Sequence, residues 1–398
     1  MNLDKERILF EIEKIYNTLI SLDYKEETDF GVLSGLGGVC LFLAEKYKIS
    51  REEDVINKTA LYFQLIYNGF NNKEYPSFTF CSGISGVGWL VNYLSKINLF
   101  ESEENNVELN NLIYQFAIHS MSQYKNYDYL HGGLGTLLYF ATLSDNQLCK
   151  SEVSNIIDKA IKLSYNENNY RYWIDDTYKK NNPEIFVPDK FVNFGLAHGL
   201  PGILLLFGKA FCVTKDKKII HIIEEGVNCI LNHELEDSLS IFPSDNFHKR
   251  GSRLAWCYGD LGIANSLYIL GNQLSNEKWI KKSIDIFIHA SKRKELLMNS
   301  IIDAGICHGA FGISHIFRRM FFNTGIEIFS KASDYWINEA LYMAKFEDGL
   351  SGYKAYHGPD KGWVKEFGLL EGIAGMGLVL LSSISKEAPN WDECLLLS

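Results

Sequence analysis

The sequence predicts an all-α protein, an (α/α)7 barrel in which seven helical hairpins form a double helical toroid. Three observations lead to this prediction. A Gly-x-x-Gly motif occurs seven times, each motif opens a strongly apolar run, and a segment with charges on one face precedes each motif. A hairpin of two ordinary helices with their loops fits the spacing of the motifs.

The glycine motifs mark the starts of the predicted inner helices. The leading glycines are Gly35, Gly83, Gly132, Gly199, Gly259, Gly309 and Gly372, and their partners are Gly38, Gly86, Gly135, Gly202, Gly262, Gly312 and Gly375. Two glycines on one helix face are expected to let neighbouring backbones approach closely. The runs that follow, such as 203–207 and 376–381, lack a polar stripe. They must therefore be covered on all sides.

The amphipathic segments ahead of the motifs are predicted to form the outer helices. They are 6–21, 54–67, 108–124, 153–166, 218–234, 276–293 and 332–346. An open solenoid of helix pairs is the alternative arrangement, but it would leave one face of each inner helix in water. A closed ring covers that face, so the pattern favours the toroid.

We expect residues 1–398 to form a single domain with one insertion. Residues 167–194 are rich in Tyr, Trp, Asn and Pro and lengthen the fourth repeat. They are predicted to be an insertion that contains extended segments. Residues 347–368, rich in Gly, Tyr, His and Lys, are predicted to loop over one end of the toroid.

Composition excludes several function classes. A formal charge of -10 with scattered Lys and Arg offers no basic face for nucleic acid. The first twenty residues mix charged with apolar side chains, which is not a signal-peptide pattern, and no apolar stretch reaches the roughly 20 residues of a membrane span. We therefore expect a cytoplasmic protein whose eight dispersed cysteines are reduced.

In a closed toroid, the loops that precede the inner helices meet at one end and share a rim. Directly before the leading glycines stand Ser34, Ser82, His131, His198, Tyr258, His308 and Glu371. One residue earlier stand Leu33, Cys81, Leu130, Ala197, Cys257, Cys307 and Leu370. Two thiols and an imidazole thus come from the neighbouring fifth and sixth repeats.

Cys257, Cys307 and His308 are the candidate metal ligands. Two thiolates and one imidazole suit tetrahedral Zn²⁺ with its fourth position open, as in catalytic sites. Buried cysteines also serve as small apolar residues, so packing is the alternative. The shared repeat position favours ligands, whereas Cys81, three repeats away, is interpreted as structural. Such a site would suit attack by a substrate thiolate on an electron-poor carbon.

The motifs resemble those of a known family. Trp256-Cys257-Tyr258-Gly259, Cys307-His308-Gly309 and Ala197-His198-Gly199, set in seven glycine repeats, resemble the lanthionine synthetase C-like proteins, most closely the stand-alone lantibiotic cyclases. The resemblance spans residues 34–381. It implies one Zn²⁺ per chain and a reaction in which a peptide cysteine adds to dehydroalanine or dehydrobutyrine, forming a (methyl)lanthionine thioether ring.

The resemblance also implies roles for further residues. His198 matches an acid/base, Asp128 its partner acid, and Arg253 a residue near the forming enolate, with Tyr258 a weaker candidate. His131 shares the repeat position of His198 and is the alternative acid. Without the resemblance, His198 reads as a core histidine, Asp128 as a helix cap and Arg253 as one half of a surface ion pair.

The implied partners follow from the implied reaction. The substrate would be a dehydrated precursor peptide, whose leader we expect to dock on residues 167–194. A separate dehydratase must supply the alkene, and a peptide exporter would bring the complex to the inner face of the membrane.

Other functions were weighed against this one. Prenyltransferase toroids need a carboxylate ligand and a basic diphosphate pocket, for which no basic cluster is present. Toroidal glycosidases need two opposed carboxylates and would leave the zinc site unused. A zinc- and glutathione-binding regulatory relative keeps both fold and metal site, so this alternative remains open.

Overall fold

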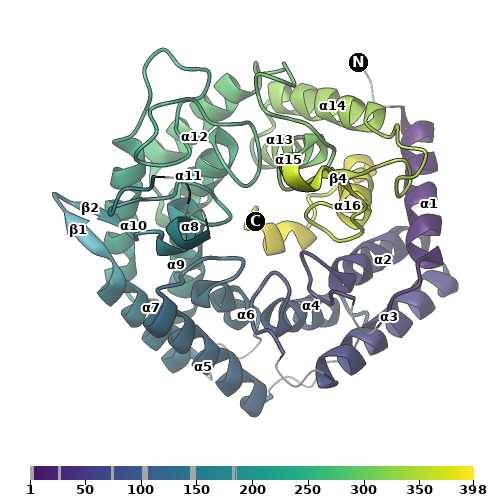
Figure 1. Cartoon of the computed structure of the whole chain (residues 1–398), viewed down its shortest axis with the longest axis horizontal. Helices are drawn as coiled ribbons and strands as arrows, with labels where there is room; N and C mark the ends of the chain where they lie inside the picture. Colours follow the sequence, from purple (N-terminus) through teal and green to yellow (C-terminus); the bar gives the residue numbers. More distant parts are fainter. Residues whose placement is uncertain are drawn as a thin grey trace.

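The computed structural model describes residues 4–25, 28–72, 76–100, 106–143, 149–181, 184 and 186–398. Figure 1 shows two concentric rings of helices around a common axis. Within the described residues, the outer ring consists of α1 (Lys5–Ser21), α3 (Glu53–Asn71), α5 (Val107–Tyr124), α7 (Lys150–Leu163), α10 (Lys218–Leu231), α12 (Glu277–Ala290) and α14 (Glu327–Tyr342). The inner ring consists of α2 (Leu36–Ser50), α4 (Ile84–Lys96), α6 (Thr136–Thr142, after the 3-10 turn η1, Gly133–Gly135), α9 (Leu200–Thr214), α11 (Asp260–Leu274), α13 (Ala310–Thr324) and α16 (Ile373–Ile384). The predicted all-α toroid is confirmed.

Inner and outer helices differ in burial as their sequences predict. In α9, the side chains from Ile203 to Phe207 are all at most 4% exposed. In α7, only one face is buried, formed by Val153, Ile156, Ile157 and Ala160. Burying each large aliphatic side chain stabilises the fold by about 1.5–3 kcal/mol, so the two rings hold each other in place.

The ring is closed. Helix α16 of the last repeat packs against α1 and α2 of the first repeat as well as against α13 of the repeat before it. The purple helices α1 and α2 and the yellow helix α16 accordingly lie side by side in Figure 1. The open solenoid is thereby excluded.

The motif glycines have a different role from the one expected. A Cβ on Gly312 would lie 1.9 Å from the carbonyl oxygen of Ile306, and one on Gly375 would lie 1.8 Å from that of Leu369. Each of these carbonyls belongs to the loop that leads into the same helix. At these two positions the second glycine therefore lets the first helical turn press against its own loop, whereas a Cβ on Gly38 would also lie 2.9 Å from Leu369 N of the last repeat.

Backbone hydrogen bonds join neighbouring loops along the rim. The amide of Leu33 donates to Cys81 O (3.1 Å) and the amide of Cys81 to Leu130 O (2.9 Å). Farther round, the amide of Cys257 donates to Cys307 O (3.1 Å) and that of Cys307 to Leu370 O (2.8 Å), and the amide of Leu370 returns to Leu33 O (2.9 Å). These bonds join the position two before the leading glycine in six of the seven repeats, from Cys257 round to Leu130.

The C-terminal segment fills the centre of the inner ring, where Figure 1 marks the end of the chain. Its 3-10 turn η2 (Trp391–Leu395) places Asp392 against His315 (2.9 Å) and Arg319 of α13. Trp256 Nε1 donates to Leu395 O at 2.9 Å. Because Trp256 directly precedes Cys257, this plug also supports the loop that carries the predicted metal ligand.

Several predicted boundaries were wrong. The segment predicted as helix 153–166 ends at Leu163, and β1 (Tyr165–Glu167) pairs with β2 (Tyr170–Tyr172) in an antiparallel hairpin. The predicted insertion thus contains extended structure, but it also holds the short helix α8 (Asp176–Asn181). The last outer helix begins at Glu327 rather than at 332.

Residues 347–368 lie against the rim. They contain β3 (Ala355–Tyr356), α15 (Gly358–Lys361) and β4 (Trp363–Val364), and β3 pairs with β4. The amide of Tyr356 donates to Asp303 Oδ2 at 2.9 Å, which fastens this segment to the loop before α13. That residues 1–398 form one domain stays a prediction. None of the described helices has the length and apolar character needed to cross a membrane.

Candidate metal centre and active site

The three predicted ligands come together at the rim. The Sγ atoms of Cys257 and Cys307 and one ring nitrogen of His308 all lie within 4.8 Å of one another. Cys257 is buried, and Cys307 and His308 are partly exposed. A donor set of two thiols and one imidazole at this spacing fits a tetrahedral metal ion with one position left for another ligand.

Gly259 allows the Cys257 loop to turn into α11. It is the one leading glycine with a positive φ (+93°), and a Cβ there would lie 2.3 Å from Arg253 O. Other residues rarely adopt that conformation. The turn brings Cys257 and Tyr258 to the rim directly before the helix begins.

The two thiols share a proton. The Cys307 thiol donates a hydrogen bond to Cys257, and this bond lowers the pKa of Cys257 to about 6 although burial opposes the shift. The same bond raises the pKa of Cys307. One of the two sulfurs is therefore a thiolate at neutral pH, which is the form that binds metals.

Asp303 orients His308. Its Oδ2 lies 3.2 Å from His308 Nε2 and also accepts the amide of Tyr356 (2.9 Å), while its Oδ1 accepts the amide of Gly305 (3.1 Å). Burial lowers the pKa of His308, but the hydrogen bond and charge of Asp303 outweigh it and raise the pKa. Because Nε2 faces Asp303, Nδ1 is left as the ligand atom. Carboxylates commonly fix metal-binding histidines in this way.

His198 and Asp128 form a partly buried ion pair beside the thiols. Asp128 Oδ2 bonds His198 Nδ1, and Asp128 Oδ1 accepts the amide of His131 at 2.6 Å. Loss of water lowers the pKa of His198, but the Asp128 carboxylate outweighs this and raises it to about 9. Burial favours the neutral acid of Asp128, yet the charge of His198 lowers the pKa of Asp128 overall.

His131 lies next to His198 but is held differently. The two rings stack with centroids 5.9 Å apart. Loss of surrounding water lowers the pKa of His131, with Asp128 opposing the shift and His198 adding to it. The Asp128 carboxylate thus bonds the ring of His198, whereas it bonds only the backbone amide of His131.

Tyr258 and Arg253 lie on the other side of the predicted metal ligands. Asn193 Nδ2 donates to Tyr258 Oη (2.9 Å) and to Asp175 Oδ2 (3.1 Å). Because Tyr258 Oη accepts this bond, its own hydrogen stays available to a substrate, and burial raises the pKa of Tyr258. Arg253 lines the adjoining cavity, and among the described residues its guanidinium has no carboxylate partner.

Two cavities border the centre. One of about 420 Å³ is lined by Cys307, His198 and His131, together with Glu366 and Glu371. The second, of about 630 Å³, is lined by Arg253, Tyr258 and Asn193. Of the predicted site residues, Cys307 and His198 thus line the first cavity, and Arg253 and Tyr258 line the second. Cys81 also reaches the first cavity, but burial raises the pKa of its thiol to about 12, in keeping with the structural interpretation.

Sequence reasoning missed a third repeat position, six residues before each leading glycine. It holds Asp29, Ser77, Asn126, Asn193, Arg253, Asp303 and Glu366. In six of the seven repeats, all except that of Arg253, the carbonyl of this residue caps the following helix, as when the amide of Leu200 donates to Asn193 O (2.8 Å). Of this set only Arg253 was predicted, although the fixed distance to the glycine could have revealed the others.

The class of the protein follows from comparison with known families. The sequence matches the family described as lanthionine synthetase C-like protein over residues 26–396. The chain therefore belongs to the lanthionine synthetase C-like family.

Individual relatives agree with the family. The nisin biosynthesis protein NisC of Lactococcus lactis subsp. lactis is 27% identical over 414 residues, covering 94% of this chain and 91% of NisC. The lacticin 481/lactococcin biosynthesis protein LcnDR2 of the same organism is 23% identical, and its match covers 91% of this chain but only 37% of that longer protein. The solved structure of nisin cyclase superposes with a TM-score of 0.74 at 21% identity, covering 98% of this chain and 97% of the cyclase. It supports the toroidal fold.

Proposed function

We propose that this protein is a zinc-dependent cyclase that adds peptide cysteine thiols to dehydroalanine or dehydrobutyrine, forming (methyl)lanthionine rings in lantibiotic biosynthesis. The observation that carries the proposal is the meeting of Cys257, Cys307 and His308 within 4.8 Å, beside a cavity that Cys307 shares with His198, the partner of Asp128. Membership of the family and the similarity to NisC support it.

Zn²⁺ fits the donor set better than harder cations, because two of the three ligands are sulfur. A Zn²⁺ held by Cys257, Cys307 and His308 would lower the pKa of a bound cysteine thiol and keep it as a nucleophilic thiolate at neutral pH. The inner helices begin at this rim, so their positive ends also favour an anion there. Asp303 would keep the His308 ring in its ligand orientation.

His198 is placed to supply the proton that completes the addition. When the thiolate attacks the β-carbon, a C–S bond forms and the alkene electron pair moves onto the enolate. Because Asp128 holds Nδ1, the transferable proton is on Nε2 of His198, which gives it to the α-carbon. The Asp128 carboxylate then stabilises the ring until it is protonated again.

Arg253 and Tyr258 would stabilise the negative charge of the enolate. A guanidinium without a carboxylate partner can bond an enolate oxygen, and the free hydrogen of Tyr258 Oη can donate to the same atom. Asn193 holds Tyr258 in position through its 2.9 Å bond.

The proposed partners follow from this reaction. The substrate is a precursor peptide that a dehydratase has already dehydrated, and an exporter would remove the product. We propose that the reaction takes place in the cytoplasm, with attachment to the membrane only through partners. The leader would dock on residues 167–194, where the exposed Phe186 contacts Phe247 with ring centroids 5.9 Å apart. Unchanged leader affinity after deletion of 167–194 would rule out this docking site.

The test compares wild type with Cys307→Ala, and with Cys81→Ala as the control at the same repeat position. Zinc content and loss of free thiol from a dehydrated cysteine-containing peptide are measured on each. Wild type and Cys81→Ala are expected to hold about one zinc and to consume the thiol, and Cys307→Ala to do neither. Zinc without thiol loss in wild type would favour the glutathione-binding regulatory alternative.

A further inference from the structure

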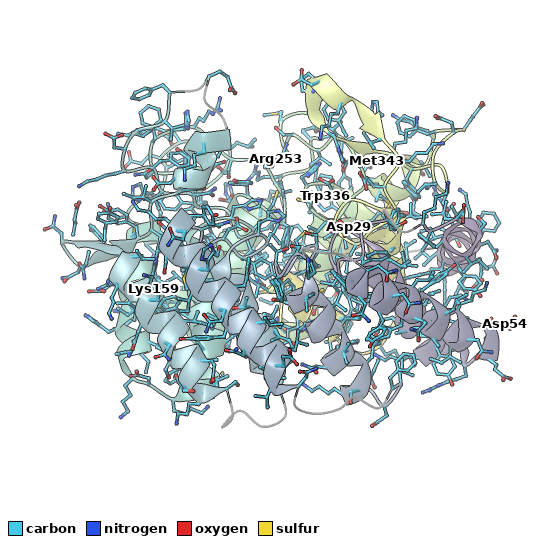
Figure 2. All side chains as sticks on the ribbon, turned by 60° about the horizontal axis from the view of Figure 1, so that its bottom comes forward. Asp29, Asp54, Lys159, Arg253, Trp336 and Met343 are labelled. Atoms are coloured by element: carbon cyan, nitrogen blue, oxygen red, sulfur yellow. The ribbon has the colours of Figure 1, made fainter. Side chains whose placement is uncertain are left out.

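The two cavities beside the predicted metal ligands carry opposite charge. Asp29, Glu366 and Glu371 line the cavity of about 420 Å³. Arg250 and Arg253 line the cavity of about 630 Å³. Figure 2 labels Arg253 near the loops at the top of the view and Asp29 above the purple helices. Asp29, Arg253 and Glu366 all occupy the position six residues before the leading glycine of their repeats. One repeat position thus contributes charge of opposite sign to the two cavities.

The acidic side has more carboxylates than cations. His357 Nε2 lies 2.9 Å from Glu371 Oε2 and 3.4 Å from Glu366 Oε1. Asp29 accepts the amide of Gly31 at 2.8 Å, and it has no cationic partner among the described residues. Burial raises the pKa of Glu366, and the neighbouring carboxylates of Glu371 and Asp29 add to this although His357 opposes them. Glu366 and Glu371 thus share His357, and Glu371 also lies 3.9 Å from His308 Nδ1. The His198 ring on this cavity is already paired with Asp128, so Asp29 keeps its charge without a cationic partner.

The basic side has guanidiniums without partners. Its one carboxylate, Asp245, already accepts the amides of Phe247 (2.9 Å) and His248 (2.7 Å) and pairs with the His248 ring at 2.9 Å. Neither Arg250 nor Arg253 forms an ion pair within the described part of the chain. Arg250 is exposed at the mouth of this cavity. An anionic group of a ligand could therefore bind here without displacing a protein carboxylate.

We propose that this charge difference orients the substrate peptide across the site. A cationic side chain on one side of the reacting segment would lie by Asp29 and Glu366, and an anionic group on the other side would lie by Arg250. The inference rests on the proposed function, because it assumes that the reacting cysteine lies between the two cavities. It adds that the site selects one direction of the chain by charge.

Two dehydrated peptides of identical composition test this proposal. Each contains one cysteine and one dehydroalanine; the first has Lys before this segment and Glu after it, and the second has the two charges exchanged. Their net charges are equal, so general attraction to the acidic protein cancels in the comparison. KM and kcat for thiol loss are measured with wild type at low and high salt.

Wild type is expected to favour one of the two peptides by roughly fivefold to tenfold in kcat/KM at low salt, and less at high salt. The Asp29→Asn/Glu366→Gln double variant and the Arg250→Gln variant should each reduce the preference. Equal kcat/KM for both peptides in wild type would overturn this inference while leaving the proposed function intact. Absence of thiol loss with either peptide would instead overturn the proposed function.

Discussion

At the scale of single residues, His198 and His131 share a repeat position but differ in how Asp128 holds them. Only the His198 ring bonds the carboxylate, whereas His131 contributes its backbone amide. We therefore expect His198→Gln to lower kcat for thiol loss by roughly 10²–10⁴-fold, the range for a lost general acid. His131→Gln should retain most of the activity. An equal or larger loss for His131→Gln would assign the acid to His131.

The same pair predicts a pH dependence. Since Asp128 raises the pKa of His198 to about 9, the acid form persists at neutral pH and kcat should fall as the pH rises through about 9. In Asp128→Asn, the fall should move toward the usual histidine value near 6.5. A pH–rate profile of kcat for both proteins measures the shift, and an unchanged alkaline limb in Asp128→Asn would contradict the assignment.

The raised pKa also has a consequence for stability. Because the pKa is higher in the folded protein than the ordinary 6.5, the ion pair stabilises the fold fully below pH 6.5. This contribution is lost as the pH rises through about 9.

Asp303 is proposed to act on the metal through His308. Its carboxylate contacts Nε2 and is itself held by two backbone amides. Asp303→Asn is expected to weaken zinc affinity by roughly 10- to 100-fold, as for other carboxylates that orient a histidine ligand. Competition with a chelating dye measures this affinity. Asp128→Asn, which alters a carboxylate that no metal ligand contacts, is the control, and equal affinities in the two variants would contradict the role of Asp303.

At the scale of elements, the start of α11 depends on Gly259. Its φ of +93° and the 2.3 Å approach of a Cβ to Arg253 O both exclude a side chain. Gly259→Ala is expected to cost at least about 3 kcal/mol in the free energy of unfolding. Gly325→Ala is the matched control, because Gly325 (φ +69°) ends α13 in open space and should cost only about 1–2 kcal/mol. Urea unfolding compares them, and equal costs would show that the close approach is unimportant.

Elements with regular sequence signals could be predicted, and those without could not. The leading glycines marked the inner helices because each stands directly before the first helical turn. The start of α14 was missed because its N-cap is Ile326, which offers no side-chain cap. The hairpin β1–β2 was missed in part because Tyr165–Glu167 continues the amphipathic pattern of α7. Its strand conformation depends on pairing with β2, which the local pattern does not reveal.

The candidate site shows the same division. Cys257, Cys307 and His308 were found because they share two fixed positions before the glycine. Asp303 and Asn193 were missed because the position they share also holds Ser77, Arg253 and Glu366, so its side chains have no common chemistry. In every repeat except that of Arg253 this position supplies a helix-capping carbonyl, which residue identity does not reveal.

At the scale of the whole molecule, closure of the ring brings residues from distant repeats to one site. Glu371 of the last repeat lies 3.9 Å from His308 Nδ1, and the first cavity joins residues from the first repeat to the seventh. The C-terminal plug is part of this assembly, because Leu395 bonds Trp256 beside Cys257. The sequence does not predict where residues 391–398 lie, because a short apolar tail has no repeat signal.

The central claim is that the thiol addition depends on a zinc ion at Cys257, Cys307 and His308. The most direct test is the rate of thiol loss from a dehydrated cysteine-containing peptide, measured on the same wild-type protein before chelation, after verified removal of the metal, and after zinc is restored. Removal of the metal is expected to lower the rate by at least roughly 10²-fold, and about one equivalent of zinc is expected to restore it. An undiminished rate in the metal-free protein would contradict the account.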